Sequence, residues 1–185
     1  MGLDMYLNRM PRYRGATAKD VFAVESYLDY IAEKEKGSEY AQCTFKEWCG
    51  IEEFPQKKYI DFYSKFYTKT KYGFGSIMEE VGYWRKANSI HRWFVENVQD
   101  GIDDCCYHRE VTKEDLEELL DICHEVICNP DLAELRLPTQ GGFFFGSTEY
   151  DEYYIDDLIN TIDMIVKILE TTDFDKEMIY YVSSW

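Results

Sequence analysis

The stretch EEVGYWRKANSIHRWFVENVQ, residues 79–99, most constrains how this chain can fold, because its inward positions recur with a helical period. One stripe of a 3.6-residue repeat contains Trp84, Ala87, His91, Phe94 and Val98. We therefore predict one amphipathic helix over residues 79–99. Asn88 lies beside His91 on the inward stripe, whereas Trp93 would lie on the opposite face.

Two features of this predicted helix need partners elsewhere in the chain. The amide of Asn88 and the imidazole of His91 would face inward, where a polar group costs free energy unless it is hydrogen-bonded. They indicate either a satisfied polar core or one wall of a pocket. The indole of Trp93 would face outward, which indicates either a contact surface for another protein or packing beneath a neighbouring loop.

The negative charge of the chain is concentrated in its C-terminal half. The 185 residues have a formal net charge of -16, yet residues 1–92 carry a net of +2 and residues 93–185 a net of -18. Such an acidic field repels nucleic acid and attracts basic surfaces. It is typical of ordinary acidic soluble proteins, and also of proteins that compete with nucleic acid for a basic groove.

The start of the chain and its cysteines indicate a cytoplasmic protein. The first residues, MGLDMYLNRMPRYR, lack the apolar run of a secretion signal, and no stretch approaches the roughly 20 apolar residues of a membrane span. We expect no membrane association, and we expect the six cysteines to be reduced thiols. They include no CxxC pair, so we expect no metal site.

The rest of the chain alternates between strand and helix signals. Residues 2–8 and 177–185 have β character, the first because Leu3, Met5 and Leu7 alternate with polar residues. We expect these two segments to pair antiparallel and to hold both ends of the chain in one sheet. Capped amphipathic helices are expected at residues 17–36, 112–128 and 149–170, with caps from Thr17, Thr112 and Thr148.

These elements predict an α+β fold class. We expect a single, mainly helical domain of about four to five helices, with a small antiparallel sheet joining the N- and C-terminal strands. A chain of 185 residues is long enough to bury one sizeable core. Residues 57–72 fit a helical stripe but also have the Tyr, Phe and Thr content of strands, so helix and strand both stay open there.

A ligand pocket is one place where the inward polar positions can meet. If the N-terminal strand, the central helix and the turn at residues 140–151 come together, their side chains converge on His91, a candidate general base. A turn into a helix at residues 146–148 would also suit an anion. The alternatives are a satisfied core histidine and a simple cap from Thr148. The pocket candidates are Asp4, Trp84, Asn88, His91, Gln140, Ser147, Glu149 and Asp151.

A protein interface is the second place where candidate residues gather. The central helix offers an outward Trp together with two Arg residues, and these residue types dominate interface energies. The acidic half offers carboxylates for a basic partner. The interface candidates are Arg85, Arg92, Trp93, Asp103, Asp104, Glu114, Glu117, Glu118, Asp121, Glu152, Asp156 and Asp157.

A third candidate surface is basic and aromatic. Cations and rings alternate over residues 65–72, and single-stranded nucleic acid is bound by such a combination. An ordinary amphipathic segment has the same pattern. The overall acidity of the chain argues against direct binding of nucleic acid.

Four sequence blocks together resemble one protein family: MGLDMYL, EVGYWRKANSIHRWFVENVQ, LPTQGGFFFGSTEYDEYY and YYVSSW. They are similar to blocks in a family of small proteins from bacterial genomes, prophages and phages. The resemblance implies a host-directed role inside a bacterial cell. A relation to type II anti-CRISPR proteins, which are phage-encoded inhibitors of Cas9, would name the target. No motif of single residues carries that relation, so no catalytic residue is transferred.

We therefore expect a phage or mobile-element inhibitor that binds a host defence effector through an acidic surface. Its partner would be a protein with a basic nucleic-acid groove, of the Cas9 type. The alternatives are a small-ligand-binding protein or enzyme that uses the pocket, and a nucleic-acid-binding protein that uses the basic aromatic segment. Walker A and dinucleotide-binding glycine patterns are absent. The sequence favours a binding protein over an enzyme, and we expect no cofactor.

Overall fold

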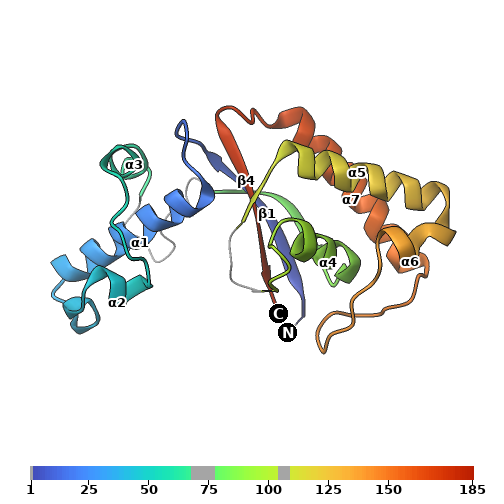
Figure 1. The fold of residues 1–185 in the computed structure, drawn as a ribbon, viewed down its shortest axis with the longest axis horizontal. Coiled ribbons are helices and arrows are strands. Elements are labelled where there is room, and N and C mark those ends of the chain that lie inside the picture. The colour runs from blue at the N-terminus through green and yellow to red at the C-terminus, as the bar shows by residue number, and fades with distance from the viewer. Residues whose placement is uncertain (1, 68–77, 104–108) are drawn as a thin grey trace. The chain divides into compact units, whose positions relative to one another are not determined.

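The computed structural model describes residues 2–67, 78–103 and 109–185, and it has the α+β architecture that the sequence predicts (Figure 1). The elements in chain order are β1 (Asp4–Pro11), α1 (Ala18–Glu35), η1 (Glu39–Gln42), α2 (Phe45–Cys49), α3 (Lys57–Tyr63), β2 (Glu79–Arg85), α4 (Asn88–Asn97), β3 (Arg109–Val111), α5 (Lys113–Cys128), η3 (Pro130–Leu132), α6 (Ala133–Arg136), α7 (Glu152–Thr171) and β4 (Glu177–Ser184).

The chain divides into two compact units. Unit 1 consists of Met1–Arg9 and Glu80–Trp185, and unit 2 consists of Met10–Glu79. Unit 1 therefore contains α4 to α7 and most of the sheet, whereas unit 2 contains α1 to α3. Among the described residues, no helix is both long enough and apolar enough to cross a bilayer.

The four strands form one antiparallel sheet in the order β2-β1-β4-β3. Because β1 and β4 are neighbours, the predicted pairing of the N- and C-terminal segments is confirmed, and both ends of the chain lie at the same end of the sheet (Figure 1). The strand β3, which the sequence does not predict, pairs with β4 so that Val111 lies opposite Ile179. Leu3, Met5 and Leu7 are fully buried in the core of unit 1, as their alternation predicts.

The predicted single helix over residues 79–99 is wrong in its first part, which is strand β2. Trp84 is buried between the exposed Tyr83 and Arg85, which is the two-residue period of a strand. The aromatic and β-branched residues of this segment favour a strand. Gly82 is needed where β2 passes α7, since a Cβ there would lie 2.6 Å from Met164 Sδ. The sequence did not distinguish the helical period from the strand period here, because Trp84 faces inward in both a helix and a strand.

The strand ends and the helix α4 begins within three residues. Lys86 has a left-handed backbone with φ of 63°, which is strained for a residue with a side chain. Its backbone N–H donates to the carbonyl of Leu3 at 2.8 Å, and its own carbonyl accepts from the N–H of Asn88 at 2.8 Å. This turn directs α4 back over the sheet, so that His91 and Phe94 join the buried core.

The helices α5 and α7 lie side by side in unit 1 (Figure 1). Their inward leucines and isoleucines belong to the same apolar core as β1, α4 and β4. The predicted cap of α5 is confirmed: the Thr112 side chain and Asp115 form a reciprocal capping box. The helix α7, which packs against this core, begins later than predicted.

The predicted cap of α7 at Thr148 is wrong. The carboxylate of Asp151 accepts hydrogen bonds from the backbone N–H groups of Tyr153 and Tyr154, at 3.0 and 3.2 Å. A carboxylate is also favoured over a hydroxyl by the helix dipole at this position. The loop before α7 is therefore longer than expected, and it includes Thr148.

Unit 2 packs the 18-residue helix α1 and the short helices α2 and α3 through aromatic rings and tyrosine hydroxyls. The predicted cap of α1 by Thr17 is confirmed. The Tyr59 hydroxyl donates to the carbonyl of Gly15 at 2.8 Å, and the Tyr63 hydroxyl donates to the carbonyl of Pro11 at 3.1 Å. Residues 57–63 are helical, as one of the two open alternatives has it. The part of the basic aromatic segment that follows Tyr67, residues 68–72, lies outside the described residues.

Candidate functional site

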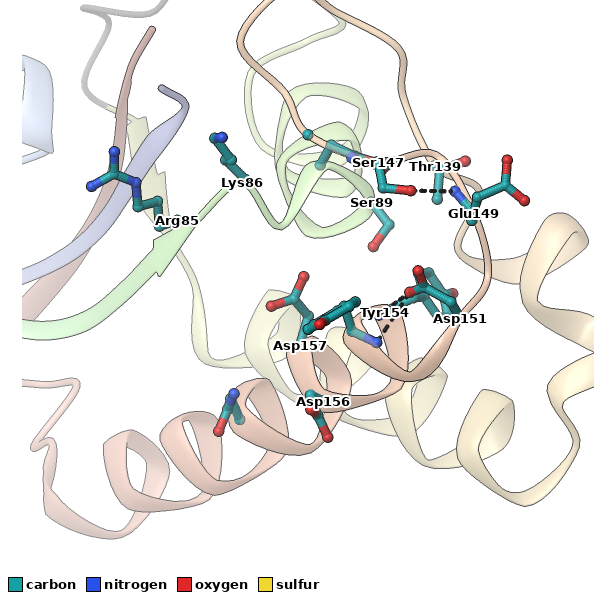
Figure 2. A pocket seen from close by; sticks show the side chains of 14 residues that line it. Arg85, Lys86, Ser89, Thr139, Ser147, Glu149, Asp151, Tyr154, Asp156 and Asp157 are labelled. Atoms are coloured by element: carbon teal, nitrogen blue, oxygen red, sulfur yellow. Dashed lines mark hydrogen bonds between the residues drawn. The ribbon is translucent and has the colours of Figure 1, made fainter. Parts of the chain in front are cut away.

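A cavity of about 490 Å³ lies in unit 1 where the end of β2, the start of α4, the loop before α7 and the start of α7 meet (Figure 2). Its volume is typical of small-molecule sites. The loop before α7 contributes residues in and beside the predicted turn at residues 140–151, and α7 contributes carboxylates. The lining consists of Arg85, Lys86, Asn88, Ser89, Thr139, Gly146, Ser147, Glu149, Asp151, Tyr153, Tyr154, Asp156, Asp157 and Asn160.

The structure brings half of the predicted pocket residues to this cavity. They are Asn88, Ser147, Glu149 and Asp151. Three residues that we expected at a protein interface, Arg85, Asp156 and Asp157, line the same cavity. The cavity therefore combines the two predicted sets, and both contribute carboxylates: Glu149 and Asp151 belong to the pocket set, and Asp156 and Asp157 to the interface set.

Asn88 fixes the loop that forms one wall of the cavity. Its side-chain Nδ2 donates to the carbonyls of Phe145 and Ser147, at 3.0 and 2.7 Å, and its Oδ1 accepts from the backbone N–H of Gln140 at 2.9 Å. Three bonds nearly exhaust what one amide can make. Asn88 is buried, so its role is to hold the loop rather than to bind a ligand. Gln140 meets it through the backbone.

The opposite corner of the cavity is shaped by a close approach between Gly146 and the strained backbone of Lys86. Gly146 has φ of 90°, and a Cβ at this position would lie 3.2 Å from the Cβ of Lys86. Only glycine adopts this conformation readily, and only glycine leaves room for Lys86. Backbone strain of this kind is often found at binding sites.

Two polar groups on the wall have no hydrogen-bond or ion-pair partner within the part of the chain that the structure describes: the Ser89 hydroxyl and the Asp157 carboxylate. Ser89 is only 3% exposed, and Asp157 is partly buried. Burial, together with the neighbouring carboxylates of Asp156 and Asp151, raises the pKa of Asp157 to about 6. An acid with a raised pKa in a cavity is a candidate for function.

Two predicted pocket residues lie elsewhere and have their own partners. The carboxylate of Asp4 accepts a hydrogen bond from the Tyr83 hydroxyl at 2.6 Å. The indole Nε1 of Trp84 donates to the Thr161 hydroxyl at 2.8 Å inside the core. Neither side chain lines the cavity, and Asp4 does not meet His91.

His91 also lies outside the cavity, in a polar contact within the core. Its Nδ1 is 2.7 Å from the Tyr181 hydroxyl, and its Nε2 is 3.2 Å from a carboxylate oxygen of Asp103. The second contact lacks the alignment of a hydrogen bond. Burial lowers the pKa of His91, and the charge of Asp103 opposes this. His91 is therefore neutral at pH 7, because burial prevails.

Unit 1 contains all the excess negative charge of the protein. It has 25 Asp and Glu residues against 9 Lys and Arg, a net of -16, whereas unit 2 has 11 of each. The helices α5 and α7 contain one lysine each, Lys113 and Lys167. Their exposed carboxylates include Glu114, Glu117, Glu118, Asp121, Glu152 and Asp156, six of the predicted interface residues.

Three other predicted interface residues, Arg92, Trp93 and Asp103, are less accessible than expected. Trp93 is only 5% exposed and packs against Phe94, so the prediction that it faces outward is wrong. The reason is that α4 is a short helix enclosed by its neighbours. Arg92 pairs with Glu96 at 2.8 Å, and Asp103 accepts from the Trp185 indole at 3.3 Å. Asp104 lies outside the described residues.

Comparisons with protein-family models, with curated proteins and with solved structures found no match. Within the described residues, no three His, Cys, Asp or Glu side chains are grouped to hold a metal ion. The candidate site therefore has to be interpreted from its own geometry.

The sequence does not predict six of the lining residues, namely Lys86, Ser89, Thr139, Tyr153, Tyr154 and Asn160. The first two sit at the strand-to-helix junction, which a single continuous helix conceals. The tripeptide Lys86-Ala87-Asn88 contains the only signal, because Asn is favoured where a helix begins.

Proposed function

We propose that this protein is a phage or mobile-element inhibitor that binds a host nucleic-acid-targeting effector through the acidic helices α5 and α7. The observation that supports the proposal is the separation of charge, with a net of -16 on unit 1 and none on unit 2. A groove built to hold nucleic acid is basic, and an acidic surface can occupy it in place of the substrate.

The partner and the place of action are part of this proposal. The four blocks resemble phage-borne proteins, which supports a host-directed role, and the partner that we propose is a Cas9-type effector in the cytoplasm of a bacterial host. Binding of this kind acts through exposed charges, so it should associate fast and weaken as salt rises.

Charge reversal tests this proposal. The variant carries Lys at Glu117, Glu118 and Asp121 of α5, and the partner is a purified Cas9-type effector at moderate salt. The matched control carries Lys at Glu39, Glu53 and Asp61 of unit 2. Both triple variants change the charge equally, and each removes one exposed pair four residues apart, Lys113–Glu117 or Lys57–Asp61.

We expect the α5 variant to lose at least about tenfold in affinity and to show a smaller salt dependence. The unit 2 control should bind within about twofold of the unaltered protein. Equal affinities for the two variants would exclude α5 as the contact surface.

A second candidate function is the binding of a small ligand in the cavity of unit 1. The observation in its favour is a cavity of about 490 Å³ with two unpartnered polar groups, Ser89 and Asp157, on its wall. A thermal-shift screen with nucleotides and metabolites tests it, because a ligand that binds the folded state raises the unfolding temperature. A hit that Ser89→Ala abolishes would place the ligand in this cavity.

A further inference from the structure

The cavity of unit 1 contains acceptor oxygens to which no group of the described chain donates a hydrogen bond. Figure 2 shows the Asp157 carboxylate projecting from α7 into the space, with the Ser89 hydroxyl directed into it from α4. The side chain of Ser89 is almost fully buried, yet its oxygen makes no hydrogen bond among the described residues. The oxygen of this hydroxyl is not one of the fully enclosed, unpartnered atoms of the described chain, so it is open to the cavity and can accept a hydrogen bond from a ligand there.

The two cations of the lining do not neutralise this wall. Arg85 and Lys86 extend along the backbone of Gly2, where Arg85 Nη2 and Lys86 Cε lie 3.6 and 3.3 Å from the position of an added Cβ. Figure 2 shows their charged ends turned away from Asp157. The lining also holds four carboxylates against these two cations, so the cavity has a net negative charge.

An anion is the less suitable ligand, although a helix begins at this cavity. The free N–H groups at the start of a helix normally attract anions. Here two of the first N–H groups of α7, those of Tyr153 and Tyr154, are already bonded to the carboxylate of Asp151. An anion would therefore meet the carboxylates with fewer of the donors that could offset them.

We propose that this cavity binds an ammonium or guanidinium group, which donates hydrogen bonds to the Asp157 carboxylate and the Ser89 hydroxyl. Hydrogen bonds between a cation and a carboxylate are about twice as strong as neutral ones. Tyr153, which is 70% exposed in the lining, offers an aromatic face to the same cation. This inference rests on the second candidate function and names its ligand class.

The cation can come from two sources with the same chemistry. One is a free small molecule that carries an amine or guanidine. The other is an Arg or Lys side chain of a basic protein, which would join this cavity to the acidic helices. The probes therefore include the free amino acid and a capped peptide.

The experiment measures binding to the full chain by calorimetry, with two matched probe pairs. L-arginine is compared with L-citrulline, which has the same shape and no charge. The capped peptide Gly-Arg-Gly is compared with its citrulline counterpart. The variants are Asp157→Asn and Ser89→Ala, and the control is Asp163→Asn, an exposed carboxylate of α7 outside the cavity. Unfolding temperatures show that each variant is folded.

We expect at least one arginine probe to saturate the protein. Its citrulline counterpart should bind more weakly by a factor of at least about ten. Asp157→Asn should weaken the arginine probe by about tenfold or more, and Ser89→Ala by a smaller factor. Asp163→Asn should stay within about twofold. Tighter binding of the peptide than of the free amino acid would assign the cation to a protein partner, and the reverse to a small molecule.

Two results overturn the inference. The first is arginine binding that neither Asp157→Asn nor Ser89→Ala changes. The second is the absence of binding by every arginine probe up to about 10 mM. If a neutral compound binds in a manner that Ser89→Ala abolishes while arginine does not bind, the ligand class is wrong and the second candidate function still holds.

Discussion

Unit 1 and unit 2 bury their apolar surface with different side chains, and they differ as much in charge. Unit 1 packs aliphatic residues of two long helices against a sheet, and it carries the whole net charge of -16. Unit 2 packs aromatic rings around the 18-residue helix α1 and two short helices, ties tyrosine hydroxyls to backbone carbonyls, and has balanced charges. Like charges repel and destabilise a compact state. The unit with the larger aliphatic core is thus the one that tolerates the repulsion.

This difference between the units also bears on the proposed function. Both the acidic helices and the cavity belong to unit 1. Uncompensated charge and unpartnered polar groups reduce stability, and binding sites commonly show this cost. Four substitutions test the comparison, and they are ordered by the size of the expected effect.

The largest effect should come from the aliphatic core of unit 1. Leu158 on α7 is fully buried, and Leu158→Ala should lower the free energy of unfolding by about 2–5 kcal/mol through lost burial and a new cavity. Leu135→Ala is the control, because Leu135 is 76% exposed and should change stability by about 0.5 kcal/mol or less. Urea unfolding measures both. A loss below about 1 kcal/mol for Leu158→Ala would contradict a core of this kind.

A smaller effect is expected from the hydroxyl bonds of unit 2. The Tyr63 hydroxyl donates to the Pro11 carbonyl and accepts from the Tyr13 N–H at 3.0 Å. Tyr63→Phe leaves that partly buried N–H without this partner, so stability should fall by about 1–3 kcal/mol. Tyr40→Phe should be neutral, because Tyr40 is 84% exposed. If the two variants unfold alike, the hydroxyls do not support unit 2.

The third substitution should increase stability. Because the pKa of Asp157 is raised to about 6 in the folded state, the folded protein holds its proton more tightly than the unfolded chain. Its contribution to stability is therefore lost as the pH rises from about 4 to about 6. Asp157→Asn avoids this loss and should gain about 1–2 kcal/mol above pH 7, after allowance for partial exposure.

Unfolding of Asp157→Asn and of the unaltered protein at pH 4 and pH 7.5 measures this gain. The two proteins should differ little at pH 4, where the carboxyl is protonated in both states. Asp163→Asn serves as the control at both pH values. A gain that is equal at pH 4 and pH 7.5 would show that the carboxylate is not the cause.

The smallest effect distinguishes a true helix cap from a false one. Thr112→Ala removes the cap of α5 and should cost about 1 kcal/mol. Thr148→Ala should cost almost nothing, because Asp151 caps α7. Thermal unfolding of both variants checks this. Equal losses would mean that the hydroxyl of Thr148 contributes to the start of α7 after all.

Local patterns predicted the fold where the signal was local. The capping boxes of Thr17 and Thr112 depend on residues three apart, and both form. The alternation of Leu3, Met5 and Leu7 places them in the core as a strand requires. These features depend on short-range geometry, which a sequence expresses directly.

Features that depend on tertiary packing were predicted poorly. The inward position of Trp84 satisfies a helix and a strand equally, so the break at Lys86 was hidden. Trp93 is buried because other elements enclose α4, which no helical period can show. Asn88 does meet the loop before α7, but through the backbone of Phe145 and Ser147. Ser89 and Asp157 become candidate ligand contacts only in the folded structure, where both line the cavity and neither side chain has a hydrogen-bond partner among the described residues.

Hydrogen exchange of the full chain, alone and with a purified Cas9-type effector at moderate salt, tests most directly whether unit 1 is the binding unit. We predict slower exchange over residues 113–128 and 152–171 in the complex, with residues 18–63 unchanged. Protection confined to residues 18–63, with α5 and α7 exchanging as in the free protein, would contradict the proposed role of the acidic helices.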